Sequence, residues 1–240
     1  MTDRAALEAL LEVQAHDTRL DQLDHQLAAL PERAARDEAA AALAATEASA
    51  AEATEARDEL ARRQKRIDDE VESLKEKQGG FDAKLYSGTV TNPRELQDLQ
   101  EEIESLGRRI SILEDQELEV MVEVDPVEAR LAELATAADE QRGALDAAET
   151  ALTAAEAELG AESDTERARR AEAAAPVPED LLGTYEKLRG ARGGIGVARL
   201  VGSQCGGCHL TLSAMEADRM RKLPDGEYGH CEECGRILVP

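Results

Sequence analysis

Two pairs of cysteines are the residues of this sequence whose type and spacing could bind a metal. Cys205 and Cys208 form one C-x-x-C motif, Cys231 and Cys234 form a second, and 22 residues separate the two motifs. A C-x-x-C turn directs both sulfurs to one point, and two such turns supply the tetrahedral thiolate set that zinc prefers. Four thiolates leave no open position for water, so the spacing predicts one structural zinc ion and not a catalytic one.

The sequence around the cysteines predicts a small zinc ribbon with an inserted helix. Ser213 fits as the N-cap of a helix that reaches Lys222, with Glu216 as the capping-box acid. A further helix at 181–189 would join the ribbon to the rest of the chain. The strands that we expect lie at 195–201, 209–212, 227–230 and 237–239. His209 and His230 neighbour cysteines, but the four thiolates already fill the site, so we expect both rings outside the coordination shell.

The composition of the remaining chain indicates long helices. The 240 residues carry a net charge of -24, and only 2% of them are aromatic. Residues 1–180 hold 20 basic and 45 acidic side chains, a charge of -25, whereas 181–240 carry +1. An acidic body repels phosphate, so the long segment is a poor nucleic-acid binder. Neither a Ser/His/Asp arrangement nor a phosphate-binding glycine loop is present, so we expect no enzyme activity.

A heptad repeat runs through the second half of the long segment. Alternate steps of three and four residues from Leu96 to Leu159 meet nineteen positions, of which only Glu117 and Gln141 are polar. This 3.5-residue period is typical of a coiled-coil seam. The same spacing recurs at 20–30 and 60–85, although steps back from residue 60 do not reach residue 30. We therefore predict a slip of the seam within the alanine-rich stretch 34–56.

The two seams predict an antiparallel helical hairpin over 1–178, with its tip at about 79–92, and the zinc-ribbon domain over 179–240. Asn92 fits as a helix N-cap and Pro93 as the first helical residue after the tip. Pro31 and Pro126 should each kink or break a helix. Phe81 and Tyr86, near the tip, either contact a partner or plug the end of the hairpin.

This combination resembles a bacterial family of zinc-ribbon domain proteins that carry a coiled-coil hairpin. Three segments carry the resemblance: residues 85–97, residues 100–106, and the ribbon with its four cysteines. Members studied in flagellated and chlamydial bacteria are adaptors that bind an alternative sigma factor and, in one branch, a flagellin messenger RNA. The resemblance implies the zinc ligands and a transcription-related protein partner. The alanine-rich, acidic arms are similar to those of high-GC bacteria.

The sequence thus favours a cytoplasmic, mainly α, non-enzymatic adaptor, and neither a signal peptide nor a membrane-spanning segment is expected. Its alternative is a protein that binds RNA or DNA through the ribbon, and a redox switch at the cysteines is a third hypothesis. Monomer and dimer remain open, because either could use the same seam. Candidate partner contacts are the residues near the tip and the cations of the ribbon: Tyr86, Asn92, Arg94, Arg199, Arg219, Arg221 and Lys222.

Overall fold

The computed structural model describes residues 3–240 and confirms a mainly α-helical chain with a small ribbon at its C-terminal end. Its helices are α1 (Arg4–Ala28), α2 (Pro31–Tyr86), α3 (Pro93–Ala174), α4 (Glu179–Ala191) and α5 (Ala214–Arg221). Its strands are β1 (Val197–Val201), β2 (Gln204–Cys205), β3 (Gly229–His230) and β4 (Ile237–Val239). Within these described residues, none of the helices has the length and apolar character needed to cross a bilayer.

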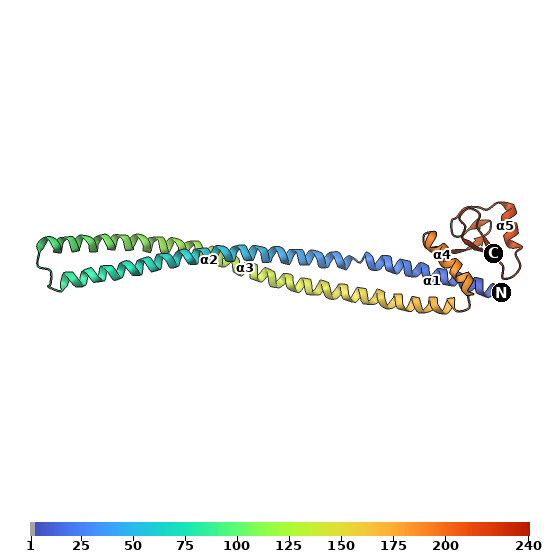
Figure 1. Ribbon diagram of the computed structural model, residues 1–240, viewed down its shortest axis with the longest axis horizontal. Coiled ribbons are helices and arrows are strands. Elements are labelled where there is room, and N and C mark those ends of the chain that lie inside the picture. Colours follow the sequence, from blue (N-terminus) through green and yellow to red (C-terminus); the bar gives the residue numbers. More distant parts are fainter. Residues whose placement is uncertain (1–2) are drawn as a thin grey trace. The chain divides into compact units, whose positions relative to one another are not determined.

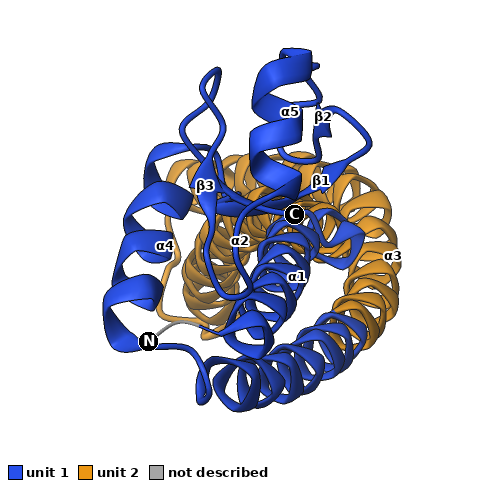
Figure 2. Ribbon diagram, turned by 90° about the vertical axis from the view of Figure 1, so that its right-hand side faces the viewer, with its two compact units in different colours: residues 1–34, 149–240 blue, residues 35–148 orange. Residues whose placement is uncertain are grey.

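The chain divides into two compact units, coloured separately in Figure 2. Ala35–Ala148 form one unit, and the other joins the residues up to Ala34 with Glu149–Pro240. The second unit therefore contains α1, the end of α3, α4 and the ribbon. The unit boundary does not follow the boundary between helical hairpin and ribbon, because α1 shares a hydrophobic core with the ribbon strands.

In the unit 35–148, α2 and α3 lie side by side and antiparallel, joined by a short turn (Figure 1). Arginines on each helix reach acids on the other, as in Arg142–Glu47 at 3.2 Å and Arg109–Glu70 at 2.9 Å. The buried core of this pair consists of aliphatic residues that the heptad places on facing sides: Ile67, Val71, Ile110, Leu113 and Val120. The helical hairpin expected from the repeat is therefore present.

The burial pattern corrects the predicted slip in the alanine-rich stretch. Steps of four and three residues back from Leu85 to Arg36 meet only buried or half-buried residues, so the seam keeps its phase through 34–56. The stripe of α1, which ends with Leu30, is offset from this phase by two residues. The offset falls between α1 and α2, where Pro31 begins a new helix. Because Pro31 has no N–H, it cannot continue the hydrogen bonding of α1, and the seam of α2 can start in a different phase.

The tip of the hairpin is shorter than the predicted 79–92. α2 continues through Gly79 and Gly80 to residue 86, and a Cβ atom at either glycine would meet no atom within 4 Å. Glycine weakens a helix without breaking it, and here the seam on either side maintains the helix. Asn92 accepts a hydrogen bond from the backbone N–H of Arg94 at 3.1 Å, so α3 begins as expected. Pro126 does not interrupt α3.

The ribbon is a four-stranded sheet in the order β2-β1-β4-β3. The central strands β1 and β4 are parallel, with Val197 opposite Ile237, and each pairs with an antiparallel outer strand. The expected strand at 209–212 is reduced to one bridge between Gln204 and Thr211. His209 has a φ of 61°, and this left-handed conformation cannot continue a strand. Ser213 caps α5 by accepting a hydrogen bond from Glu216 N–H.

Candidate metal centre and partner-binding residues

The two C-x-x-C turns bring all four cysteine sulfurs within 4.8 Å of one another. The Sγ atoms of Cys205 and Cys234 are 4.0 Å apart, and those of Cys208 and Cys231 are 3.9 Å apart. A tetrahedron with metal–sulfur bonds of about 2.3 Å has edges of about 3.8 Å, so these separations fit a four-thiolate metal site. The first cysteine of each pair is buried and the second is half-buried. The four sulfurs form a metal-binding site.

The two turns have the same backbone geometry. The carbonyl of Cys205 accepts a hydrogen bond from His209 N–H at 2.8 Å, and the carbonyl of Cys231 accepts one from Gly235 N–H at 2.7 Å. Both donors directly follow the second cysteine of their pair and have left-handed φ angles, 61° for His209 and 72° for Gly235. In the first turn, Gly206 is needed because a Cβ there would lie 2.9 Å from the carbonyl oxygen of Arg199.

The protein environment shifts the pKa values of Cys205, Cys231 and Cys234 in different directions. Burial raises the pKa of Cys205 and raises that of Cys231 to about 12. Burial opposes ionisation of Cys234 as well, but hydrogen bonds from the backbone and side chain of Arg236 lower its pKa to about 7. Because thiolates are the metal ligands, these hydrogen bonds favour the ligating form of Cys234.

The candidate contacts on the ribbon are already engaged within the protein. Arg199 forms two hydrogen bonds to the carboxylate of Glu8 in α1, and the one from Nη1 to Oε1 is 3.1 Å long. Arg221 donates to the carbonyl of Gly202 at 2.6 Å. The other two cations form ion pairs: Arg219 with Glu216 at 3.4 Å and Glu232 at 3.6 Å, and Lys222 with Asp218 at 2.6 Å. These cations support the ribbon and its contact with α1.

Of the candidate contacts near the tip, only Asn92 has a structural role that the structure describes, as the N-cap of α3. Tyr86 ends α2 with 83% of its surface exposed, so it does not plug the hairpin. Arg94 is exposed in the first turn of α3, whereas Asn92 acts as the N-cap. Phe81 is half-buried beneath the ammonium group of Lys84, which lies 5.9 Å from the ring centroid. Tyr86, Asn92 and Arg94 belong to the unit 35–148, and the ribbon cations belong to the other.

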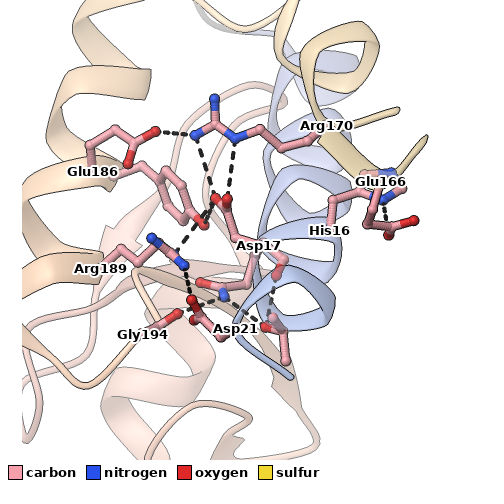
Figure 3. A network of polar contacts seen from close by, with 11 residues as sticks. His16, Asp17, Asp21, Glu166, Arg170, Glu186, Arg189 and Gly194 are labelled. Carbon is pink, nitrogen blue, oxygen red and sulfur yellow. Dashed lines mark hydrogen bonds and ion pairs between the residues drawn. The ribbon is translucent and has the colours of Figure 1, made fainter. Parts of the chain in front are cut away.

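Sequence reasoning missed a buried polar cluster that joins α1, α3 and α4 (Figure 3). We call it the Asp17 cluster: Asp17, Arg170, Tyr185, Glu186 and Arg189. Asp17 is 5% exposed, accepts a hydrogen bond from Arg170 Nε at 3.2 Å and one from the Tyr185 hydroxyl at 2.7 Å, and lies 3.8 Å from Arg189 Nε. Arg170 also pairs with Glu186. Burial and this bond to Asp17 raise the pKa of Tyr185.

His16 is part of the same polar region. Its Nδ1 lies 2.7 Å from Oε1 of Glu166, which is 8% exposed. The buried hydroxyl of Ser163, one turn earlier in α3, has no hydrogen-bond partner and is not linked to this pair. The heptad gives only a partial signal for the region: alternate steps beyond Leu159 meet Glu162, Glu166 and Arg169, of which only Glu166 is buried. The buried or half-buried positions there are Ser163, Glu166 and Arg170, which require an additional step of four residues after Leu159.

The helical hairpin and the four-thiolate ribbon together define a class of coiled-coil zinc-ribbon proteins. Residues 13–193 match the CT398-like coiled coil hairpin domain, and residues 204–238 match the C4-type zinc ribbon domain. The chain belongs to this CT398-like coiled-coil hairpin family.

Relatives and solved structures agree with this assignment. The Mycobacterium tuberculosis protein Rv2229c is 32% identical over 235 residues, which cover 98% of this chain and 95% of that protein. A solved structure from Mycobacterium smegmatis has a TM-score of 0.88 at 28% identity, covering 100% of this chain and 99% of that one. CT398 from Chlamydia trachomatis shares the fold, with a TM-score of 0.61 at 20% identity over 98% of this chain and 97% of that one.

Proposed function

We propose that this protein is a non-enzymatic adaptor that binds a protein partner through its helical hairpin, with a ribbon stabilised by one structural zinc ion. The observation that carries the proposal is Tyr86, which is 83% exposed at the end of α2. The chain has only four aromatic residues, one Phe and three Tyr. A solvated tyrosine contributes nothing to a core, whereas tyrosine is enriched where proteins meet.

The metal site supports the structural part of this role. Four thiolates close the coordination shell of zinc, so the cysteines of this chain would hold the ion without a position for substrate. The bound ion would supply folding free energy to the ribbon, whose core includes two of the cysteines themselves. Four cysteines that are grouped as metal ligands and form no disulfide suit a reducing compartment, and we place the protein in the cytoplasm.

The nucleic-acid alternative has weaker support. Four cations of the ribbon, Arg199, Arg219, Arg221 and Lys222, already contact acids or carbonyls of the chain. Phosphate would have to compete with these internal partners. Tyr228, the only Phe, Tyr or Trp in residues 192–240, is half-buried against the core and makes an edge-to-face contact with the ring of His230 at 5.7 Å, so it is a poor stacking platform.

Affinity purification of the full chain from its native host tests the proposal. The parent and a Tyr86→Ser variant would be compared, each with and without nuclease treatment. Because Tyr86 is outside any core, the variant should fold normally and yet lose a protein that the parent retains after nuclease. Loss of every bound component on nuclease treatment, from parent and variant alike, would instead identify a nucleic-acid complex and overturn the proposal.

A further inference from the structure

A second surface of the helical hairpin, in the middle of α3, combines exposed apolar side chains with unpaired acids. We call it the exposed α3 patch: Asp115, Leu118, Glu119, Met121 and Val122. Leu118 is 61% exposed and Val122 is 71% exposed, and Met121 beside them is half exposed. Positions three and four residues apart are neighbours on a helix, so these three side chains form one apolar surface. They face away from the seam, where Leu113 and Val120 are buried.

The charge around this surface has one sign. Residues 110–129 contain seven acidic side chains and no Lys or Arg. Glu114 and Glu123 are paired with Lys75 and Arg63 of α2. Within residues 3–240 the structure gives no ion pair to the other five acids, which are Asp115, Glu117, Glu119, Asp125 and Glu128. Asp115 and Glu119 are four residues apart, a like-charge spacing that destabilises a helix.

The backbone adds an acceptor at the same place. Pro126 lies inside α3 and has no N–H to donate. The carbonyl of Val122, four residues earlier, therefore lacks the donor that an α-helix normally supplies. An exposed apolar surface, a local excess of carboxylates and a free carbonyl coincide within three turns. These features lie outside the seam that folds the hairpin, and together they suit the binding of another molecule.

We propose that the exposed α3 patch binds a cationic amphipathic helix of a protein partner, an inference that rests on the adaptor role and names the chemistry of one partner segment. Leucine-like side chains of such a helix would cover Leu118, Met121 and Val122, while its Lys or Arg residues reach Asp115 and Glu119. Nucleic acids and anionic lipid surfaces would be repelled by the same carboxylates. A second copy of α3 would bring like charges together.

A binding titration on the full chain tests this inference. The probe is a fluorescein-labelled 18-residue peptide with Leu on one helical face and Lys on the other, and its control has Glu in place of Lys. Leu118→Ser combined with Val122→Ser should weaken binding of the Lys peptide at least tenfold without lowering the melting temperature. Met215→Ser, which removes an 83% exposed side chain from α5, should change the affinity for the Lys peptide less than twofold.

The carboxylates are tested separately. Asp115→Asn with Glu119→Gln should weaken binding several-fold and reduce its salt dependence, whereas Glu140→Gln with Glu149→Gln, at exposed positions elsewhere on α3, should not. The inference is overturned if the serine variant binds the Lys peptide as tightly as the parent, or if the Glu peptide binds equally well. Because these variants leave Tyr86 intact, such a failure would not affect the capture experiment with Tyr86→Ser, and the two proposals can fail independently.

Discussion

The hydroxyl of Tyr185 donates a 2.7 Å hydrogen bond to Oδ2 of Asp17, and this bond joins α4 to α1. Arg170 of α3 binds the same carboxylate from another direction, at 3.2 Å. One buried side chain thus connects three helices at the place where the ribbon meets the helical hairpin. Burial of a carboxylate is favourable only while its cations and its hydroxyl donor remain in place. Substitution of each residue of the Asp17 cluster should therefore change the free energy of unfolding.

Asp17→Asn should destabilise the unit that contains the ribbon by about 3 kcal/mol, because Arg170 and Arg189 would lose their shared buried counter-ion and keep only the more exposed Glu186 and Asp21. Tyr185→Phe should cost less, about 1 kcal/mol, since the carboxylate keeps its cations. Chemical denaturation followed by circular dichroism measures both changes. Asp24→Asn, at an exposed position of the same helix, is the control and should have little effect. Equal costs for Asp17→Asn and Asp24→Asn would show that the Asp17 cluster does not hold the three helices together.

Glu166→Gln should lower stability in a pH-dependent way. The hydrogen bond from His16 lowers the pKa of Glu166 below its usual 4.5, although burial acts in the opposite direction. A depressed carboxyl pKa contributes stability above the pKa of the unfolded chain, and this contribution is lost as the pH falls through the folded pKa. We expect a loss of about 1 kcal/mol for the variant at pH 7. The free energies of unfolding of parent and variant should converge well below pH 4.5, and a constant difference across that range would contradict this account.

The sequence predicted the architecture well because its signals are periodic or chemically specific. The seam of α3 and the paired cysteines each depend on a regular spacing, and both are found where they were expected. Positions that depend on packing between distant segments were missed. Asp17 and Tyr185 are 168 residues apart, and neither has a neighbour in the sequence that reveals the contact. The slip was misplaced because alanine fits a seam in any phase, so that only the burial pattern shows where the phase changes.

Gly196→Ala should weaken the junction between α4 and β1. A Cβ at this position would lie 2.6 Å from the carbonyl oxygen of Tyr185 and 2.7 Å from its ring, and backbone cannot move aside cheaply. We expect a loss of about 2 kcal/mol, as for overpacked cores. Gly183→Ala, in α4 with no atom within 4 Å of the added methyl, is the matched control and should stabilise the protein slightly. Thermal denaturation would separate the two, and equal melting temperatures would exclude a close contact at Gly196.

Substitution of the left-handed residue should destabilise one cysteine turn and leave the other nearly unchanged. Gly235→Ala places a Cβ on a backbone with a φ of 72° and should cost about 1 kcal/mol. His209→Gly relieves the same strain in the first turn, so it should be close to neutral even though glycine increases the entropy of the unfolded chain. Zinc affinity of the full chain, measured by competition with a chelating dye, reports both effects. A loss of affinity in His209→Gly as large as that in Gly235→Ala would mean that the imidazole has a role at the site.

Removal of the metal should unfold the ribbon and leave the long helices. α2 and α3 contain 56 and 82 residues, whereas α5 in the ribbon has eight. A strong chelator should therefore change the helical circular dichroism by roughly a tenth or less, while protease sites appear between β1 and β4. Cys208→Ser should produce the same protease pattern without a chelator. A collapse of the helical signal on chelation would show that the hairpin also depends on the metal.

The central claim is that the hairpin turn contacts a protein, and a photo-crosslinking amino acid at position 86 tests it most directly. The full chain with this substitution would be expressed in the native host and irradiated, beside a control that carries the same group at Glu140, an exposed position of α3. The adaptor account predicts a discrete protein adduct at position 86 that is resistant to nuclease and absent from the control. An adduct with RNA alone, or the same protein adducts at both positions, would contradict it.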